Sequence, residues 1–369
     1  MVLPTLAVAG MEVMVTDLAD RLTRRGHDVG VTCVADASGP LAERLRDAGI
    51  RVSHVPAPGV WSNVSAPALR AHFARLQPDV VHVHSGCWGQ AARAARQARV
   101  PAVVHTAHGV DSHDPWHTPY FKRWAALHTD AIVAVSREHR QHLIDSVGVA
   151  PAKVRVIANG IDVDRFRPGA HSGVLRARLG VGDHPLVGVV ARFAPIKNHA
   201  VLLDAFARVV AAGSTPAHLV LVGDGDLRPA LEAQAQELGI AGRVHFAGLA
   251  ADPAPWYRDL DAFVLSSNSE ATSMSIIEAM ASGLPVVATA VGGTPDLLDS
   301  DAGVLVPPRD PDALGAALTA VLTNAGRREA LGAAARARAV ARYGNSAMTD
   351  AYEALYAEVG LPRRAVTPP

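Results

Sequence analysis

Short apolar runs alternate with helical patterns rich in Ala, Arg and Leu along almost the whole chain, and this alternation constrains the fold most. Strands joined by single helices pair in parallel, because the helix carries the chain back across the sheet. Strands covered by helices on both faces are apolar throughout. The sequence therefore predicts an α/β fold with doubly wound parallel sheets. We expect strands at residues 2–9, 27–35, 51–55, 80–84, 102–106, 131–135, 186–191, 218–222, 244–246, 262–266 and 284–288.

The length of the chain predicts more than one domain. Its 369 residues suit two large α/β lobes. The turn-forming residues 166–169 divide the pattern, so we expect an N-terminal domain over residues 1–168 and a C-terminal domain over 169–339. Residues 327–358 resemble one or two helices without a following strand, and residues 362–369 a flexible tail. Two such lobes are expected to bind a ligand in the cleft between them, at the carboxyl ends of their strands.

Charge and cysteine content argue against several classes of protein. The 35 basic and 35 acidic residues balance, which argues against electrostatic binding of nucleic acid. Two cysteines without CxxC spacing argue against a disulfide framework and structural zinc, and favour a reducing compartment. The chain contains no run of about 18 apolar residues. We therefore expect a cytoplasmic protein, with any membrane contact peripheral and on the inner face.

The segment SSNSEATSMSIIEAMASGLPVVATAVGG, residues 266–293, indicates the kind of ligand. It holds two glutamates, Glu270 and Glu278, separated by small hydroxyl residues and the start of a helix. Each carboxylate can accept two hydrogen bonds from sugar hydroxyls, and a helix N-terminus offers unpaired N–H groups to an anion. The segment therefore predicts a site for a ligand that is both phosphorylated and rich in hydroxyls, such as a nucleotide sugar.

A basic turn follows the strand expected at residues 186–191. The turn reads R-F-A-P-I-K-N and places Arg192 and Lys197 at the carboxyl end of that strand. A planar guanidinium and a compact ammonium together suit the oxygens of a diphosphate. A solvated loop is the alternative. Only 3 of the 35 basic residues are lysines, and this bias favours a specific role for Lys197.

Two glycine turns could also approach a ligand. Gly10 lies between the first strand and its helix, where backbone N–H groups can meet a phosphate. Gly248 follows the strand at 244–246 and could let a base or phosphate come close to the backbone. Both positions are equally compatible with ordinary tight turns.

Four histidines cluster at the ends of two expected strands: His82, His84, His105 and His108. No cysteine or carboxylate cluster accompanies them, so we expect no metal site. Buried, hydrogen-bonded roles are expected for the first three. The glycine that follows His108 indicates open space at its imidazole, which makes it the better candidate for contact with a substrate.

An aromatic and basic segment runs from Trp116 to Trp124. It contains four of the 17 aromatic residues together with Lys122 and Arg123. Such a segment suits a lipid interface or an apolar acceptor, and residues 1–168 carry a small excess of basic over acidic residues, 19 against 15. Ordinary core packing is the alternative.

Four segments, in order along almost the whole chain, resemble the retaining family-4 glycosyltransferases of GT-B fold, or glycosyl transferases group 1. They are AGMEVMVTDLADRLTRRGHDV, VIANGIDVDRFRP, VARFAPIKN and the segment from Ser266 to Gly293. The resemblance implies two Rossmann-like domains with an interdomain cleft, of which the C-terminal one holds the nucleotide sugar. It also implies that the last helix, about residues 340–360, packs back on the N-terminal domain.

The resemblance assigns expected roles to individual residues. Arg192 and Lys197 match the pair that neutralises the donor diphosphate. Glu278 matches the glutamate that binds the ribose hydroxyls, and Glu270 the one that contacts the donor sugar. His108 matches the histidine near the donor sugar and acceptor, so the expected catalytic residues are His108, Arg192, Lys197 and Glu270. The expected donor-binding residues are Gly10, Arg192, Lys197, Gly248, Glu270, Ala271, Thr272, Ser273, Met274 and Glu278.

Two departures from the family pattern affect loops. Members commonly carry Gly-Gly and then Glu-Arg in the first loop, where this chain has Ala9-Gly10 and Glu12-Val13. The glycine often found after the first glutamate is here Ala271, which costs little unless its φ is positive. These changes concern loop geometry and the acceptor more than the donor site.

The resemblance implies a hexosyltransferase-type glycosyltransferase that moves a sugar from a nucleoside diphosphate sugar to a hydroxyl acceptor with retention of configuration. It favours a UDP-sugar over a GDP-sugar and implies no metal or other cofactor. The acceptor is expected to be a glycan, a lipid-linked molecule or a small molecule, used in cell-envelope, polysaccharide or glycolipid synthesis. A peripheral membrane contact through the N-terminal domain fits this role. Two alternatives are a GT-B-fold sugar-nucleotide epimerase or hydrolase, and a non-catalytic partner that binds nucleotide sugar.

Overall fold

The computed structural model divides the chain into two compact units, Met1–Gly160 with Asn345–Pro369, and Ile161–Gly344. It describes residues 1–7, 10–57, 65–84, 86–109, 118–250, 252–298 and 301–360, so the expected tail at 362–369 lies outside the described residues. The chain thus enters the second unit after residue 160, whereas the sequence places the boundary at 168. The reason is packing: the ring of Phe166 lies edge-on against Tyr257, a residue of the second unit, with ring centroids 5.7 Å apart.

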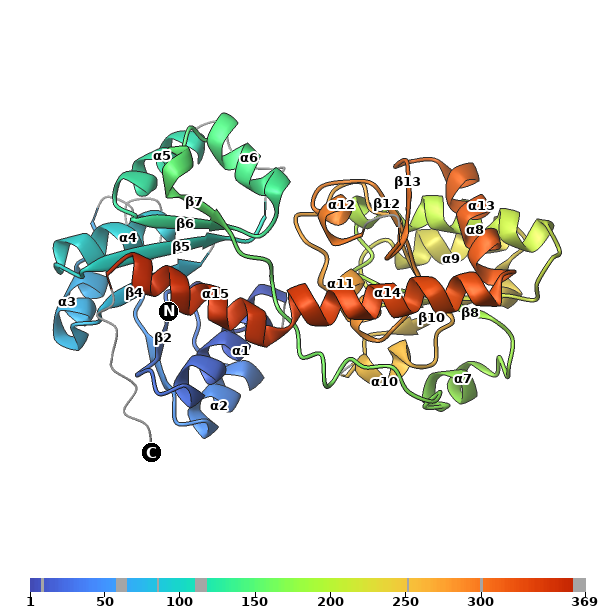
Figure 1. Cartoon of the computed structure of the whole chain (residues 1–369), viewed down its shortest axis with the longest axis horizontal. Coiled ribbons are helices and arrows are strands. Elements are labelled where there is room, and N and C mark those ends of the chain that lie inside the picture. The colour runs from blue at the N-terminus through green and yellow to red at the C-terminus, as the bar shows by residue number, and fades with distance from the viewer. Residues whose placement is uncertain are drawn as a thin grey trace. The chain divides into compact units, whose positions relative to one another are not determined.

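The first unit is built on a seven-stranded sheet in the order β3-β2-β1-β4-β5-β6-β7 (Figure 1). All of its strand pairs are parallel. Its strands are β1 (Val2–Leu3), β2 (Gly30–Cys33), β3 (Arg51–His54), β4 (Val80–His84), β5 (Ala102–Ala107), β6 (Ala131–Ala134) and β7 (Val154–Val156). Its helices are α1 (Gly10–Arg24), α2 (Pro40–Asp47), α3 (Pro67–Leu76), α4 (Trp88–Gln97), α5 (Thr118–Leu127), α6 (Arg137–Asp145) and α15 (Asn345–Glu358).

The second unit holds a six-stranded parallel sheet in the order β10-β9-β8-β11-β12-β13. Its strands are β8 (Leu186–Val190), β9 (His218–Val222), β10 (Val244–Gly248), β11 (Ala262–Leu265), β12 (Val286–Thr289) and β13 (Val304–Val306). Its α-helices are α7 (Val174–Leu179), α8 (His199–Ala211), α9 (Arg228–Glu237), α10 (Ala254–Tyr257), α11 (Met274–Ala281), α12 (Thr294–Leu297), α13 (Pro311–Leu322) and α14 (Ala325–Tyr343).

Each sheet reverses its strand order once, between β1 and β4 in the first unit and between β8 and β11 in the second. Strands on the two sides of such a point send their loops in opposite directions, which leaves a crevice at their carboxyl ends. The two parallel sheets and the helices between their strands confirm the predicted α/β class of two doubly wound, Rossmann-like domains. They also show where each unit can hold a ligand.

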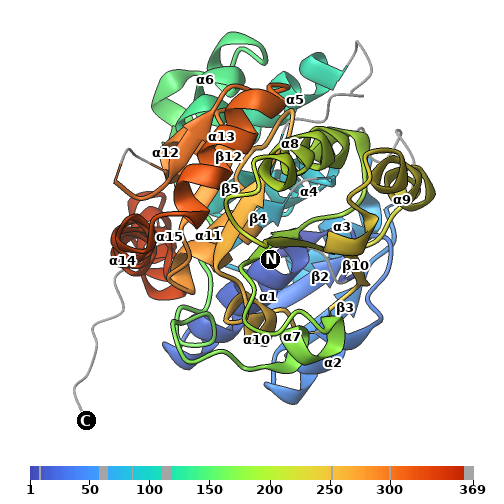
Figure 2. The ribbon, with the colours of Figure 1, turned by 90° about the vertical axis from the view of Figure 1, so that its right-hand side faces the viewer.

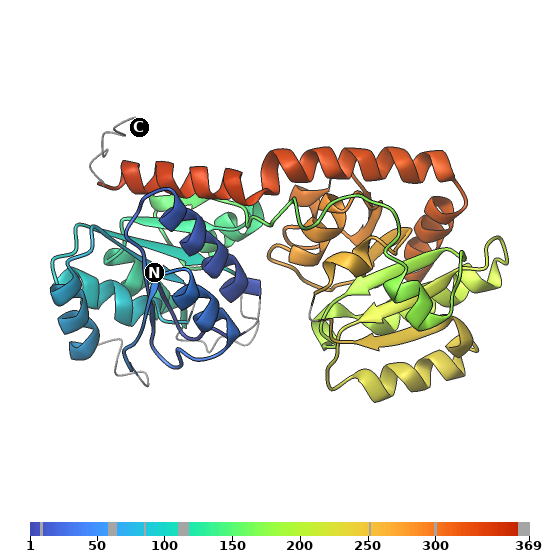
Figure 3. The ribbon, with the colours of Figure 1, turned by 90° about the horizontal axis from the view of Figure 1, so that it is seen from below.

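The last helix, α15, belongs to the core of the first unit and lies beside α1 (Figure 3). Tyr352 and Tyr356 are buried in that core. Their hydroxyls reach polar groups of the sheet: the Tyr356 hydroxyl lies 2.7 Å from Nδ1 of His82, and the Tyr352 hydroxyl 2.9 Å from Oγ1 of Thr106. The two tyrosines bury their rings and pair their hydroxyls in this core. This packing explains why the chain ends in a helix that no strand follows.

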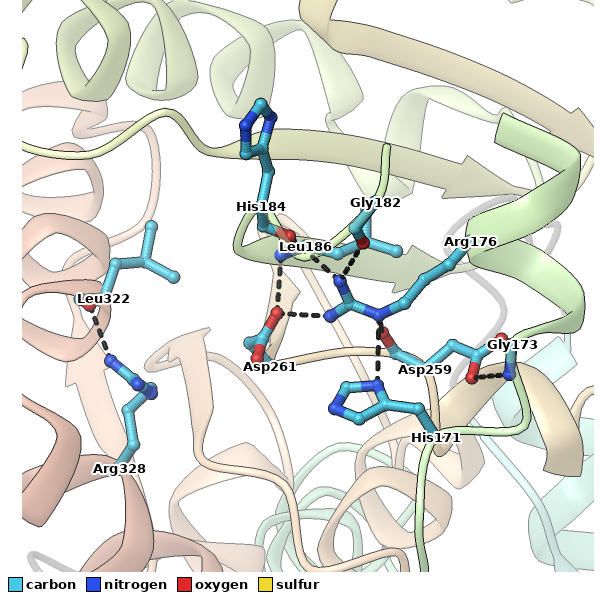
Figure 4. A network of polar contacts seen from close by, with 10 residues as sticks. All are labelled: His171, Gly173, Arg176, Gly182, His184, Leu186, Asp259, Asp261, Leu322 and Arg328. Atoms are coloured by element: carbon cyan, nitrogen blue, oxygen red, sulfur yellow. Dashed lines mark hydrogen bonds and ion pairs between the residues drawn. The ribbon is translucent and has the colours of Figure 1, made fainter. Parts of the chain in front are cut away.

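In the second unit, α8 and α13 pack side by side (Figure 2). Near the start of this unit, Arg176 of α7 lies at the centre of a network of polar contacts, shown in Figure 4. The guanidinium donates to the carbonyls of Gly182 and His184 at 2.8 and 3.0 Å and to Oδ2 of Asp261 at 2.7 Å. The backbone N–H of Leu186 donates to the same carboxylate oxygen at 2.7 Å. This network ties the segment before β8 to the start of β11, the two strands between which the sheet order reverses.

Candidate functional site

A cavity of about 330 Å³ lies at the carboxyl ends of β8 and β11, the point at which the second sheet reverses its order. One wall comes from the end of β8 and the turn after it, and the other from the segment that leads into α11 and from α11 itself. The cavity is lined by Val190, Ala191, Arg192, Lys197, Glu270, Thr272, Ser273, Met274, Ser275 and Glu278. It therefore brings together seven of the ten residues expected to bind the donor.

The basic turn is held in place by the loop after β11. Residues Pro195–Lys197 form a single 3-10 turn, and Asn198 follows with a left-handed φ of +50°. The buried hydroxyl of Ser266 lies 3.1 Å from the carbonyl oxygen of Lys197 and 3.0 Å from that of Asn198. Because β8 and β11 are adjacent parallel strands, two segments far apart in sequence meet at one edge of the sheet.

Lys197 and Glu270 form an ion pair at the cavity wall. The ammonium Nζ lies 2.5 Å from Oε1 of Glu270, whose side chain is 7% exposed. The Ser267 hydroxyl donates to the same oxygen at 2.6 Å. An ion pair of this kind places a carboxylate and a cation at fixed positions, and the low exposure of the carboxylate strengthens its electrostatic interactions.

The backbone of Glu270 is fixed by the turn after β12. Gly292 has a φ of +56°, and a Cβ atom added there would lie 1.6 Å from the carbonyl oxygen of Glu270. The N–H of Gly293 donates to that same oxygen at 3.0 Å. A side chain at residue 292 would therefore displace Glu270, which makes this glycine a requirement of the site.

The helix α11 begins at the cavity and presents its N-terminus there. The hydroxyl of Ser273 caps it by accepting a hydrogen bond from the N–H of Ile276 at 3.4 Å. The cap leaves other N–H groups of the first turn for a ligand, and their partial positive charge favours an anion. The cavity thus combines two side-chain cations with a helix N-terminus.

Glu278 lies about one helical turn further along α11, half-buried in the cavity wall. Burial raises the pKa of its carboxyl to about 7, and a hydrogen bond from the Tyr257 hydroxyl at 2.8 Å opposes that rise. The carboxylate therefore titrates close to neutral pH.

Four further residues shape the site, although the sequence assigned them no individual role: Tyr257, Ser266, Ser267 and Gly292.

Ala271, Gly10 and Gly248 do not line the cavity. Ala271 is not among the described non-glycine residues with positive φ, so alanine fits at the position where the family that the chain resembles often has glycine. Gly248 ends β10 with a φ of +72° and open space on its Cβ side, and its carbonyl accepts from the N–H of Gly223 at 2.9 Å. Gly10 begins α1 in the first unit.

His108 also belongs to the first unit, where it pairs with another histidine. Its Nε2 lies 3.0 Å from Nδ1 of His84. Burial lowers the pKa of His108 to about 3 and that of His84 well below its ordinary value. Both rings are therefore neutral near pH 7, and one N–H of the pair donates to the other ring. The sequence placed both side chains at strand ends but did not predict this hydrogen bond.

The histidines of this cluster have protein partners. His82 contacts the Tyr356 hydroxyl and, through Nε2, Oγ1 of Thr106 at 2.7 Å. His105 contacts the carbonyl oxygen of Val83 at 3.1 Å, and its ring stacks on Trp88 with centroids 4.0 Å apart. Within the described parts of the chain, no group of three or more His, Cys, Asp or Glu residues is arranged to hold a metal ion.

Part of the expected aromatic and basic segment forms α5, while Trp116 lies outside the described residues. Tyr120 and Leu127 are 70% and 74% exposed, so core packing does not account for them. Trp124 is half-buried, and the guanidinium of Arg93 lies over its ring at 5.4 Å. Among the helices in the described residues, none has the length and hydropathy of a membrane span.

Models of known families match both halves of the chain: "Glycosyltransferase Family 4" matches residues 8–165, and "Glycosyl transferases group 1" matches residues 184–324. D-inositol 3-phosphate glycosyltransferase from Xylanimonas cellulosilytica is 34% identical over 93% of this chain and 91% of its own length. The corresponding protein from Geodermatophilus obscurus is 34% identical over 89% and 80%.

Solved structures have the same fold. A glycosyltransferase from Rickettsia africae matches 97% of each chain with a TM-score of 0.85 and 21% identity. HepE from Anabaena, in complex with UDP-glucose, matches 97% of this chain and 98% of its own, with a TM-score of 0.81 and 24% identity. These likenesses confirm the GT-B fold that the sequence predicts.

Proposed function

The chain belongs to glycosyltransferase family 4 and is a glycosyltransferase, and from this premise we propose that it moves a sugar from a nucleoside diphosphate to a hydroxyl acceptor with retention of configuration. One observation carries the proposal. A single cavity, at the point where the second sheet reverses its strand order, is lined by two cations, two carboxylates and the N-terminus of α11. Their chemistry matches the diphosphate and the hydroxyl groups of a nucleotide sugar.

The diphosphate binds between Arg192, Lys197 and the start of α11. Arg192 offers a planar fork to two phosphate oxygens, and Lys197 offers a compact charge. Departure of the diphosphate places negative charge on the leaving oxygen, and donors fixed in advance at that position lower the barrier without reorganising. The residues of the cavity themselves therefore supply the charge that the leaving group needs.

The two glutamates divide the hydroxyl groups of the donor. Glu278 accepts hydrogen bonds from the ribose, and Glu270 orients the transferred sugar without acting as a nucleophile. Both described side-chain contacts of Glu270 fall on Oε1. The Lys197 ammonium has three protons to donate. When the diphosphate binds, the ammonium can therefore donate to Glu270 and to a phosphate oxygen at the same time.

Transfer proceeds on the face of the sugar that the diphosphate leaves. The bond from the anomeric carbon to the diphosphate oxygen breaks through an oxocarbenium-like state, and a bond to the acceptor oxygen forms on the same face. The acceptor proton passes to the leaving diphosphate. The products are the nucleoside diphosphate and a glycoside with the donor's configuration. We also propose His108, which belongs to the first unit, as a catalytic residue for this transfer.

A UDP-sugar is our preferred donor, since the Anabaena neighbour was solved with UDP-glucose. For the acceptor we favour a hydroxyl group of an envelope glycan, a glycolipid or a small molecule. The relatives named above are D-inositol 3-phosphate glycosyltransferases, so this polyol phosphate belongs in any acceptor panel. We further propose that the protein is cytoplasmic and that α5 contacts the inner face of the membrane peripherally, because this helix carries the exposed Tyr120 and Leu127 together with Lys122 and Arg123.

Product analysis tests the proposal. The protein is incubated with UDP-, GDP-, ADP- and dTDP-sugars, with and without an acceptor panel that includes D-inositol 3-phosphate. We expect nucleoside diphosphate and a new glycoside only when an acceptor is present. Release of free sugar or an epimerised donor without acceptor would contradict transfer, and so would donor binding with no turnover on any acceptor.

A further inference from the structure

Tyr257 places a fully buried phenol beside the carboxylate of the cavity. It ends α10 and has no exposed surface. Its ring packs against two other rings, edge-on to Phe166 with centroids 5.7 Å apart and tilted to Phe263 with centroids 5.8 Å apart. A ring packed in this way cannot swing, so its hydroxyl has a fixed position.

That hydroxyl faces two acceptors. It lies 2.8 Å from Oε2 of Glu278 and 3.3 Å from the carbonyl oxygen of Ser275. A phenol has one proton to donate, and the shorter contact is with the carboxylate. Oε2 is therefore engaged by the protein, which leaves Oε1 for a ligand hydroxyl at the cavity wall.

We propose that Tyr257 is a positioning residue for the donor: its hydroxyl holds Glu278 in the orientation and charge state that accept hydrogen bonds from the ribose. This inference rests on the proposed function, because it assumes that Glu278 binds a nucleotide. It goes beyond that function by naming a residue outside the cavity lining that acts through another side chain.

The second acceptor gives the pair two arrangements. When Glu278 is ionised, the phenol donates to Oε2 and the carboxylate accepts from the ligand. When Glu278 is protonated, its own O–H can donate to the phenol oxygen, and the phenol proton can turn to the Ser275 carbonyl. In the second arrangement Oε1 accepts from the ribose as an oxygen of a neutral carboxyl group, which is a weaker acceptor than a carboxylate, so the nucleotide binds more weakly.

The groups around Glu278 determine the pH at which one arrangement replaces the other. Burial raises the pKa of Glu278 to about 7, while the Tyr257 hydrogen bond and the charge of Arg165 lower it and the charge of Asp252 raises it. Arg165 and Asp252 are themselves paired at 2.7 Å, so their effects on the carboxylate partly cancel. Arg192, Lys197 and Glu270 also line the cavity and belong to the same electrostatic environment. Removal of the phenol hydroxyl therefore shifts the pKa of Glu278 upward.

The test compares Tyr257→Phe with wild type by calorimetric titration of UDP across a pH series that brackets 7. We expect wild-type affinity to fall as pH drops through about 7, where Glu278 gains its proton. The Tyr257→Phe protein should bind UDP about tenfold more weakly at neutral pH, with its midpoint at higher pH. A matched control is Tyr343→Phe, which removes a hydroxyl that donates to the carbonyl oxygen of Asp296 at 2.9 Å. This control should keep the wild-type affinity and midpoint.

A double-variant cycle separates failure of the inference from failure of the proposed function. In a Glu278→Ala background, Tyr257→Phe should cost no further affinity, because the phenol acts only through that carboxylate. If wild type binds none of UDP, GDP, ADP or dTDP, the proposed function fails. If wild type binds UDP and Glu278→Ala weakens it, but Tyr257→Phe behaves like Tyr343→Phe in affinity and midpoint, the inference alone is overturned. Circular dichroism of each variant verifies folding.

Discussion

The ammonium of Lys197 lies 2.5 Å from Oε1 of Glu270, and the two residues come from the loops that follow adjacent parallel strands. Residues 73 positions apart in sequence are thus paired at the wall of one cavity. In the function that we propose, the pair joins the cation that meets the leaving diphosphate to the carboxylate that orients the sugar. A change in either residue should therefore affect both functions.

Substitution of Lys197 by Ala should lower turnover by about a hundredfold or more, because a donor fixed at the developing charge is lost and Glu270 loses its cationic partner. Lys197→Arg should restore part of the activity, since the charge returns but the compact geometry does not. Initial rates at saturating donor measure both effects. Arg243→Ala, which removes a cation of the same unit outside the cavity lining, is the control. Equal rates for Lys197→Ala and this control would contradict the assigned role.

Substitution of Gly292 by Ala should damage the site through the backbone. The added Cβ would meet the carbonyl oxygen of Glu270 at 1.6 Å, at a residue whose φ of +56° disfavours a side chain. We expect a loss of about 2–4 kcal/mol in unfolding free energy and reduced turnover. Gly326→Ala is a suitable comparison, because the nearest atom to its added Cβ is 3.7 Å away. It should leave stability unchanged or slightly raised in chemical denaturation, and a similar loss in both variants would argue against a steric cause.

Glu278→Gln should stabilise the ligand-free protein while weakening nucleotide binding. The folded-state pKa of Glu278, about 7, exceeds its ordinary value of 4.5, so its contribution to stability falls as pH rises between these values. Glutamine has no charge to desolvate. We expect a gain of about 1 kcal/mol, or a few degrees in Tm, at pH near 8 and almost none at pH near 5. Thermal melts at both pH values provide the measurement, and a gain of equal size at both would show that the charge is not its cause.

The fold class could be predicted from the sequence, because a long alternation of strands and helices is compatible with few folds besides doubly wound parallel sheets. The segment holding Glu270 and Glu278 lines the cavity, and its residue types support the prediction of a nucleotide sugar, which remains a proposal. The two strands that the sequence missed, β7 and β13, have three residues each, too few to show a period. Of the strand expected at residues 2–9, the described residues form β1 over Val2–Leu3.

The sequence did not predict the residues that support the site, because their roles depend on contacts between distant segments of the chain. Tyr257 ends a four-residue helix, and nothing local distinguishes it from a core aromatic until its hydroxyl is seen beside Glu278. Gly292 looks like an ordinary turn glycine until the close approach of Glu270 is known. The pairing of His84 with His108 likewise depends on two strands meeting in space. These roles come from tertiary contacts, which the identity of a single residue does not predict.

The central claim is that the cavity of the second unit holds the diphosphate of the donor between Arg192, Lys197 and the start of α11. Calorimetric affinities of UDP and of uridine, measured for wild type and for the Arg192→Ala/Lys197→Ala double variant, test it most directly. We predict that wild type binds UDP at least about a hundredfold more tightly than uridine, and that the double variant loses most of this preference. A double variant that keeps the full preference for UDP would contradict the claim.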